Sequence, residues 1–197
     1  MQNAEATKER ILKAALGEFS AHGVAGARVD RIAKAAGCNK NLIYIYFDNK
    51  ETLFTTVLER NLARVYEDMP FTPEDPAAFA GRVFDFSMEN PELLRLLAWS
   101  TLEESVELPA GRAGSHNTKV AAVAQAQVDG KISAEFSAPY LMTTIMALAT
   151  SWSPAFPFGM APDEQQPAPA ELRRYIVRTI AAITEGSAAD EGPSRQG

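Results

Sequence analysis

The sequence predicts an all-α protein of about nine helices, and three observations support this. Apolar residues recur at helical spacing along most of the 197-residue chain, and no stretch shows the convincing alternation of a half-buried strand. Helix start signals are clear, the strongest being Asn90-Pro91-Glu92, which puts proline at the first helical position after a capping residue. Proline-containing breaks at residues 69–76 and 153–170 divide the pattern.

The first helix is expected over residues 7–21, with Gly23 shortly after its end and one apolar face formed by Ile11, Ala15 and Phe19. Two short helices follow. Apolar residues at i, i+3, i+4 and i+7 define the first of these, namely Val29, Ile32, Ala33 and Ala36. Gly37 suits the turn after it. The next helix begins at about residue 39 and turns Ile43 and Phe47 inward.

The later helices follow in order. Asp48-Asn49 resembles an N-cap for a fourth helix over residues 50–68, and 69–76 reads as a linker loop. The remaining helices are expected over 76–89, 91–105, 116–128, 137–152 and 170–185, with a glycine-containing loop over 109–115. The predicted domains are a helix-turn-helix domain over 1–48, a larger helical domain over 49–186, and a disordered tail over 187–197.

The two short helices joined by a tight turn form a helix-turn-helix, and the second has the properties of a recognition helix. Its outward face carries Lys40, Asn41 and Tyr44, which can donate to phosphates and base edges. Each residue also has a simpler interpretation: a solvated lysine, a local cap and a packed tyrosine. The combination favours DNA binding.

The charge distribution agrees with DNA contact at one end only. The net charge of the chain is −6, which taken alone argues against a nucleic-acid binder. Residues 1–60, however, hold nine Lys/Arg and seven Asp/Glu, whereas the remainder holds ten and eighteen. A polyanion is therefore expected to meet the N-terminal segment and to avoid the acidic remainder.

Several other classes of protein are not expected. The single cysteine allows no intrachain disulfide. The sequence shows no signal-peptide pattern and no apolar run of membrane-spanning length. We therefore expect a cytoplasmic protein that does not enter membranes. Because the chain has only two histidines and one cysteine, we expect no structural zinc site, and we expect no other metal and no cofactor. No H-E-x-x-H, G-x-S-x-G, P-loop or dinucleotide-binding motif is present, so no enzymatic activity is expected.

Residues 7–54 resemble the TetR family of bacterial transcriptional repressors, with ungapped spacing. The matching residues are Arg10-Ile11-Leu12, Ala14-Ala15, Phe19, Gly23, Val29, Ile32-Ala33, Ala36-Gly37, Tyr44, Tyr46-Phe47, Lys50 and Leu53. The resemblance implies a homodimer that binds a palindromic operator through its first three helices. It also implies that residues 49–186 form a ligand-binding and dimerisation domain. In that domain the fourth helix is the link, the later helices hold a small-molecule effector pocket, and the last two form much of the dimer interface.

Two departures from the family pattern concern the DNA-binding helices. The family often has Ser or Thr before the second helix, where this chain has Arg28, which loses a cap and adds a cation. The family often has a Gly or Thr pair before the tyrosine, where this chain has Asn41 and Leu42, and this difference is expected to change the operator that is read. The expected DNA-binding residues are Arg28, Asn39, Lys40, Asn41, Tyr44, Tyr46 and Lys50.

The effector pocket is harder to place. Large apolar side chains suit such a site, although core packing explains each of them equally well. The candidate pocket residues are Phe84, Met88, Trp99, Met142, Met146 and Trp152. Glu103 and Glu104 would select a cationic ligand if they point inward, and otherwise form an exposed pair. The predicted function is a ligand-responsive repressor, and the alternative is a helix-turn-helix regulator without a small-molecule effector.

Overall fold

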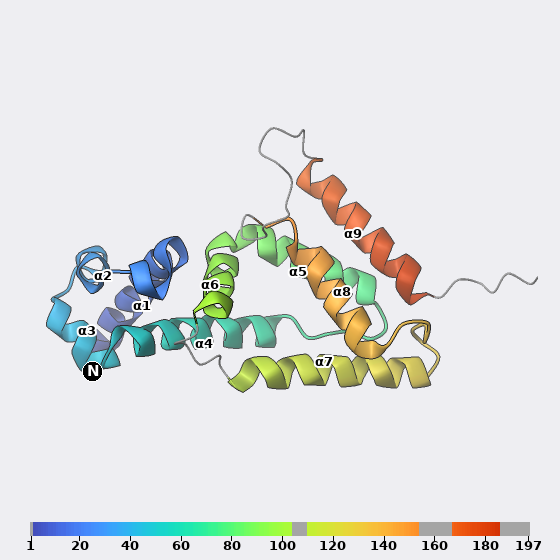
Figure 1. The fold of residues 1–197 in the computed structure, drawn as a ribbon, viewed down its shortest axis with the longest axis horizontal. Helices are drawn as coiled ribbons and strands as arrows, with labels where there is room; N and C mark the ends of the chain where they lie inside the picture. The colour runs from blue at the N-terminus through green and yellow to red at the C-terminus, as the bar shows by residue number, and fades with distance from the viewer. Residues whose placement is uncertain (1, 104–109, 154–166, 186–197) are drawn as a thin grey trace, which may run out of the picture. The chain divides into compact units, whose positions relative to one another are not determined.

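A computed structural model describes residues 2–103, 110–153 and 167–185 (Figure 1). Nine α-helices and no strands occur in these ranges, so the predicted all-α class is confirmed. The helices are α1 (Gln2–Gly26), α2 (Val29–Ala36), α3 (Lys40–Phe47), α4 (Lys50–Asp68), α5 (Pro76–Glu89), α6 (Pro91–Leu102), α7 (Ala110–Val128), α8 (Ala138–Thr150) and α9 (Pro169–Thr184). None of these helices is long and apolar enough to cross a membrane.

The helices form two compact units. Of the residues that the structure describes, the first unit contains 2–68, 87–103, 110–115 and 153, and the second contains 69–86, 116–152 and 167–185. Helices α5 and α7 each contribute to both units. The first unit thus includes α4 and α6 as well as the three N-terminal helices.

The core of the first unit is built around α1. Ile11, Ala15 and Phe19 are fully buried on one of its faces, as the helical spacing predicts. The Phe19 ring meets that of Phe54 from α4 edge-on, with centroids 5.2 Å apart. Helix α1 packs against α2, α4 and α6, and α3 in turn packs against α2 and α4.

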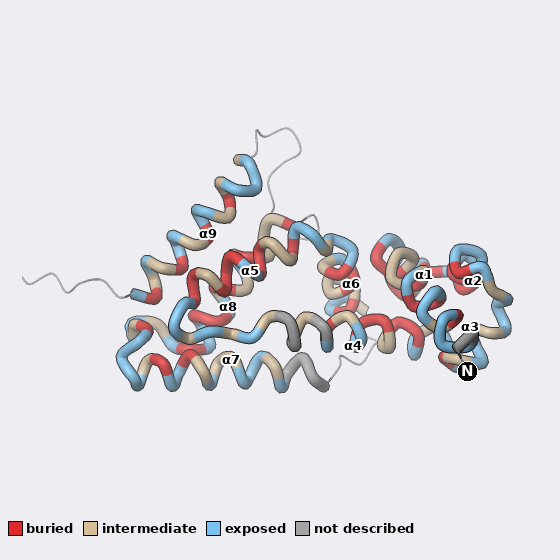
Figure 2. Tube along the Cα trace, turned by 180° about the vertical axis from the view of Figure 1, so that it is seen from behind, coloured by how far each residue is buried: buried red, intermediate tan, exposed pale blue. Residues whose placement is uncertain are grey.

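The second unit has two apolar clusters. One joins α5, α8 and α9 through buried side chains that include Phe84, Ile145 and Ile176. The other joins α7 to α8 around Val123 and Met142. Figure 2 shows this burial as red segments that recur at intervals along α9, the pattern expected of an amphipathic helix, and that cover most of α5.

The largest differences from the predicted helix boundaries occur in three helices. Helix α1 begins five residues before residue 7 and continues to Gly26 through a kink at Gly23, which adopts φ 64° and ψ −176°. Helix α6 ends at Leu102, because Glu103 turns to an extended conformation. Helix α7 begins at Ala110, so the predicted loop over 109–115 is wrong from residue 110 onward. Glycine weakens a helix by only about 1 kcal/mol, which packing can offset.

Some predictions fall outside the described residues. These are the tail over 187–197, most of the proline-containing break after residue 153, and Glu104.

Candidate nucleic-acid interface

The turn between α2 and α3 depends on Gly37. This residue ends α2 in the left-handed conformation, with φ 63° and ψ 42°, which favours glycine. The N–H of Cys38 donates to the Ala33 carbonyl at 3.0 Å and closes the turn. Cys38 is half-buried there, as expected for a packing residue.

Asn39 caps the recognition helix. Its side-chain oxygen accepts the N–H of Asn41 at 2.9 Å, so one of the unpaired donors at the start of α3 is satisfied. Ile43 and Phe47 are buried on the inner face of α3, which fixes its rotation about its own axis. The outer face then exposes four side chains: Lys40, Asn41, Tyr44 and Ile45.

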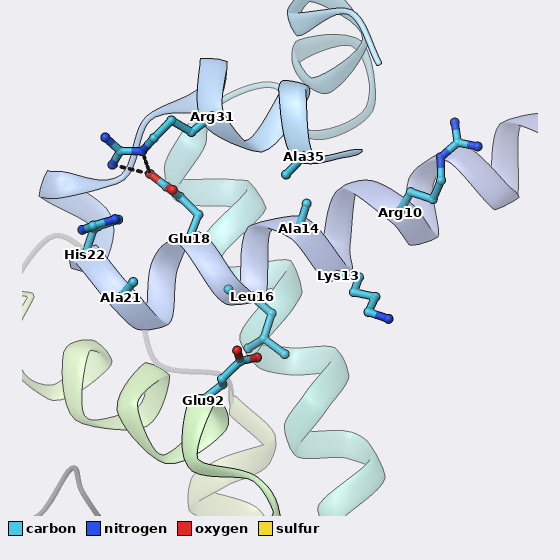
Figure 3. Close-up of a pocket in the computed structure, with 11 residues that line it drawn as sticks. Arg10, Lys13, Ala14, Leu16, Glu18, Ala21, His22, Arg31, Ala35 and Glu92 are labelled. Carbon is cyan, nitrogen blue, oxygen red and sulfur yellow. Dashed lines mark hydrogen bonds and ion pairs between the residues drawn. The ribbon is translucent and has the colours of Figure 1, made fainter. Parts of the chain in front are cut away.

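A carboxylate from α1 holds the start of α2. Arg28 occupies the N-cap position and its side chain caps nothing, as the departure from the family pattern predicts. Glu18 instead accepts the N–H of Arg28 at 2.8 Å and Nε of Arg31 at 2.7 Å. Figure 3 shows this contact at one end of a hollow between α1 and α2 that Glu92 of α6 also lines.

These contacts change the ionisation of Glu18. Burial alone would raise its pKa, but the hydrogen bonds from Arg31 and from the Arg28 backbone outweigh burial, so the pKa lies below its ordinary value. Glu18 therefore stays ionised at neutral pH and holds α2 against α1.

Lys40 is not a free cation. Its Nζ lies 3.0 Å from Oδ1 of Asp30 on α2, and this partner raises the pKa of Lys40. Both side chains are well exposed, so the pair is weak enough to exchange for another anion. The contact keeps the ammonium group beside the outer face of α3.

The junction between α3 and α4 is tightly built. Asp48 has φ 64° and ψ −58°, an unusual conformation for a residue with a side chain, and the N–H of Asn49 donates to the Phe47 carbonyl at 2.7 Å. Asn49 also caps α4 by accepting the N–H of Thr52 at 2.7 Å, which confirms the predicted start signal.

Lys50 ties this junction to the segment before α2. Its Nζ donates to the carbonyl oxygens of Ala25 and Ala27 at 3.5 and 3.4 Å. These long contacts leave capacity for a phosphate oxygen, because an ammonium group has three donors. Tyr46 is half-buried and its ring meets that of Phe47 edge-on, so it is less available than Tyr44.

Helix α6 is fastened to the kink of α1. A carboxylate oxygen of Glu103 accepts the N–H groups of Val24 and Ala25 at 2.9 and 3.1 Å, just after the kink at Gly23. Trp99 donates from Nε1 to the Ser20 carbonyl at 3.2 Å. Glu103 therefore acts as a cap in the first unit, and it is not the exposed carboxylate of one interpretation of the sequence.

The six candidate pocket residues are distributed over both units. Met88 and Trp99 belong to the first unit, where Met88 is exposed and Trp99 packs beside Gly23. The other four belong to the second unit: Phe84, Met142, Met146 and Trp152. Met146 packs against both apolar clusters, and the buried Nε1 of Trp152 has no hydrogen-bond partner among the described residues.

The sequence interpretation missed two residues of the first unit. Ile45 lies one helical turn after Asn41 on the outer face, a position that the helical period alone would have identified. Glu103 contacts residues about 79 positions earlier in the chain, and no local pattern signals such a contact. Within the described ranges, no group of three or more His, Cys, Asp or Glu residues is arranged to hold a metal ion.

Comparisons with known proteins match both parts of the chain. Residues 11–57 match the family model for bacterial regulatory proteins of the tetR family. Residues 75–182 match the model for the tetracyclin repressor-like C-terminal domain. The predicted resemblance over residues 7–54 is thus confirmed and extends over most of the chain.

Individual relatives agree with the family models. The chain is 44% identical over 156 residues to the HTH-type transcriptional repressor SCO4008 of Streptomyces coelicolor, covering 78% of this chain and 81% of that protein. It is 31% identical over 112 residues to the HTH-type transcriptional repressor NicS of Pseudomonas putida, covering 53% of each. The crystal structure of SCO4942 from Streptomyces coelicolor superposes with a TM-score of 0.81 at 31% identity, covering 90% of this chain and 98% of that one. The chain belongs to the TetR family of transcriptional regulators.

Proposed function

We propose that the protein is a ligand-responsive transcriptional repressor. As a homodimer, it binds a palindromic operator in the cytoplasm and leaves it when a small molecule binds. The observation that carries the proposal is the outer face of α3, where Lys40, Asn41 and Tyr44 are exposed together on a helix whose inner face is buried. A helix of this kind fits the major groove, and a two-fold dimer places two of them on one side of the duplex.

Each exposed side chain has a definite task in this proposal. Asn41 reads a base edge, and its amide suits the paired donor and acceptor of adenine. Lys40 and Tyr44 contact phosphates, with Lys40 exchanging Asp30 for a phosphate oxygen. Arg28, Tyr46 and Lys50 add phosphate contacts around the recognition helix, and Asn39 presents it as the cap.

The helices after α3 supply the effector response. Residues 1–48 act as the DNA-binding domain and 49–186 as the domain that binds effector and dimerises. Met146 joins the two apolar clusters, and Trp152 offers a buried donor, so these two are the first positions to test for effector contact. By linkage, the effector and the operator weaken each other's binding by the same factor.

The test begins with an operator selected from random duplex DNA. Fluorescence anisotropy then measures the operator affinity of wild type and of Lys40→Ala and Asn41→Ala. Lys131→Ala is a matched control, because Lys131 is a similarly exposed lysine of the second unit that also pairs with a carboxylate, Glu74, at 3.1 Å. We expect Lys40→Ala and Asn41→Ala to weaken binding about tenfold or more, and Lys131→Ala to leave it unchanged. Equal affinities of all four proteins would contradict the proposal.

The effector response has a separate test. A library of small metabolites and drugs is screened by thermal shift, because a ligand that binds only the folded protein raises the Tm. A genuine effector lowers operator affinity in the anisotropy assay. If none of the ligands that raise the Tm lowers the affinity for the operator, the alternative function holds, and the protein is a regulator without a small-molecule effector.

A further inference from the structure

Ile45 stands out on the outer face of α3. Its side chain is 74% exposed, whereas the inner face of the same helix buries Ile43 almost completely. Isoleucine has a lower helix propensity than alanine, so helix formation does not account for its presence there. An apolar side chain at this position gains nothing from water and is available to a partner.

The proposed function specifies that partner as the major groove. Among the groups that base pairs present there, the C5-methyl of thymine is the apolar one, and the others are hydrogen-bond donors and acceptors. We propose that Ile45 is a specificity-determining residue that packs on a thymine methyl group of the operator. This inference rests on the proposed DNA binding and adds one base to what the recognition helix reads.

The spacing along α3 fixes where this thymine lies. Asn41 and Ile45 are four residues apart, so they share a face and their Cα atoms are about 6 Å apart along the axis. Successive base pairs are about 3.4 Å apart. The thymine contacted by Ile45 therefore lies one to two base pairs from the adenine read by Asn41.

The test removes the methyl group from the DNA. Each thymine of the selected operator is replaced in turn by deoxyuridine, which lacks the methyl and keeps the base pair. We expect wild type to lose about three- to fivefold in affinity at one thymine in each half-site, the effect of one buried carbon group. Ile45→Ala should bind the operator more weakly than wild type does. Deoxyuridine at that position should change the affinity of Ile45→Ala by less than about 1.5-fold. Ile45→Val, which keeps part of the branched side chain, should give an intermediate response.

Three outcomes are distinguishable. The inference is supported if one thymine affects the affinity of wild type, but not of Ile45→Ala, when it is replaced by deoxyuridine. Replacing the adenine one to two base pairs away should then no longer change the affinity of Asn41→Ala. If wild type binds its operator but deoxyuridine has the same effect on wild type and Ile45→Ala at every position, the inference is wrong and the DNA-binding proposal stands. If no operator can be selected, the proposed function is wrong, and the inference that rests on it is wrong as well. Because Ile45 is exposed, its replacement should leave the Tm within about 1–2 °C of wild type, which separates lost readout from lost folding.

Discussion

Replacement of Gly23 by alanine should destabilise the first unit strongly. Gly23 has φ 64° and ψ −176°, a region of backbone conformation that is almost restricted to glycine. A Cβ atom at this position would lie 2.8 Å from Cε3 of Trp99 and 2.9 Å from a carboxylate oxygen of Glu103. Both neighbours are held by hydrogen bonds to α1, so neither can move away without losing one.

The magnitude follows from two contributions. Holding alanine in this backbone region costs about 1–3 kcal/mol. Overpacking against a fixed ring and carboxylate costs about another 1–3 kcal/mol. Together they predict a loss of about 2–6 kcal/mol of unfolding free energy, which for a chain of this size lowers the Tm by about 4–24 °C. That is a large fraction of the stability of a typical domain.

Urea denaturation followed by tryptophan fluorescence measures this loss, with two other glycines as controls. Gly17→Ala adds a Cβ that meets nothing within 4 Å, in the middle of α1, and should raise stability by about 0.5–1 kcal/mol. Gly37→Ala adds only left-handed strain, again with nothing within 4 Å, and should cost about 1 kcal/mol. A Gly23→Ala variant that loses no more than Gly37→Ala would refute the proposed fastening of α6 to α1.

Three further changes test other contacts. Asp30→Asn removes the partner of Lys40 and a negative charge beside the recognition helix. Anisotropy should therefore show that the affinity for operator and for unrelated DNA rises about two- to fivefold. An unchanged affinity would mean that Asp30 does not compete with phosphate for Lys40. Glu18→Gln should be less stable than wild type at pH 7. The pKa of Glu18 in the folded state lies below the ordinary value of 4.5, so the stability difference between wild type and Glu18→Gln should persist above pH 4.5 and shrink as the pH falls below it. Urea midpoints of the two proteins that stay equally far apart from pH 7 to pH 3 would contradict this account. Asp48→Gly relieves the unusual backbone conformation at the end of α3. The relief of about 1–3 kcal/mol of strain outweighs the roughly 0.5–1 kcal/mol cost of glycine, so calorimetry should show a Tm that is a few degrees higher. An unchanged or lower Tm would argue against strain at Asp48.

Local signals in the sequence predicted much of the fold. Helix α4 begins after the cap at Asn49, and α5 begins at Pro76, both as expected, because capping and proline act within one turn. The α2–α3 turn was predicted from Gly37, whose left-handed conformation is a local requirement. The start of α7 was not predicted, because Gly114 and its polar neighbours resemble a loop while the structure continues the helix through them.

Contacts between distant segments set the limit of sequence prediction at the site. The outer face of α3 follows from helical spacing, so Lys40, Asn41 and Tyr44 were found. Their partners were not, because the pairing of Lys40 with Asp30 depends on the angle between two helices. Glu103 illustrates the same limit over a greater separation, since its cap on α1 exists only after α6 has packed against α1.

The central claim is that two copies of the chain read one operator through α3. The most direct test is the binding of wild-type protein to the selected operator, measured by anisotropy at 50 and 200 mM salt with an excess of unrelated DNA. The account predicts saturation at two chains per operator, survival against the competitor, and an affinity that falls by at least about a hundredfold between the two salt concentrations, since several phosphates are contacted. Saturation at one chain per operator, or binding that the competitor abolishes, would contradict it.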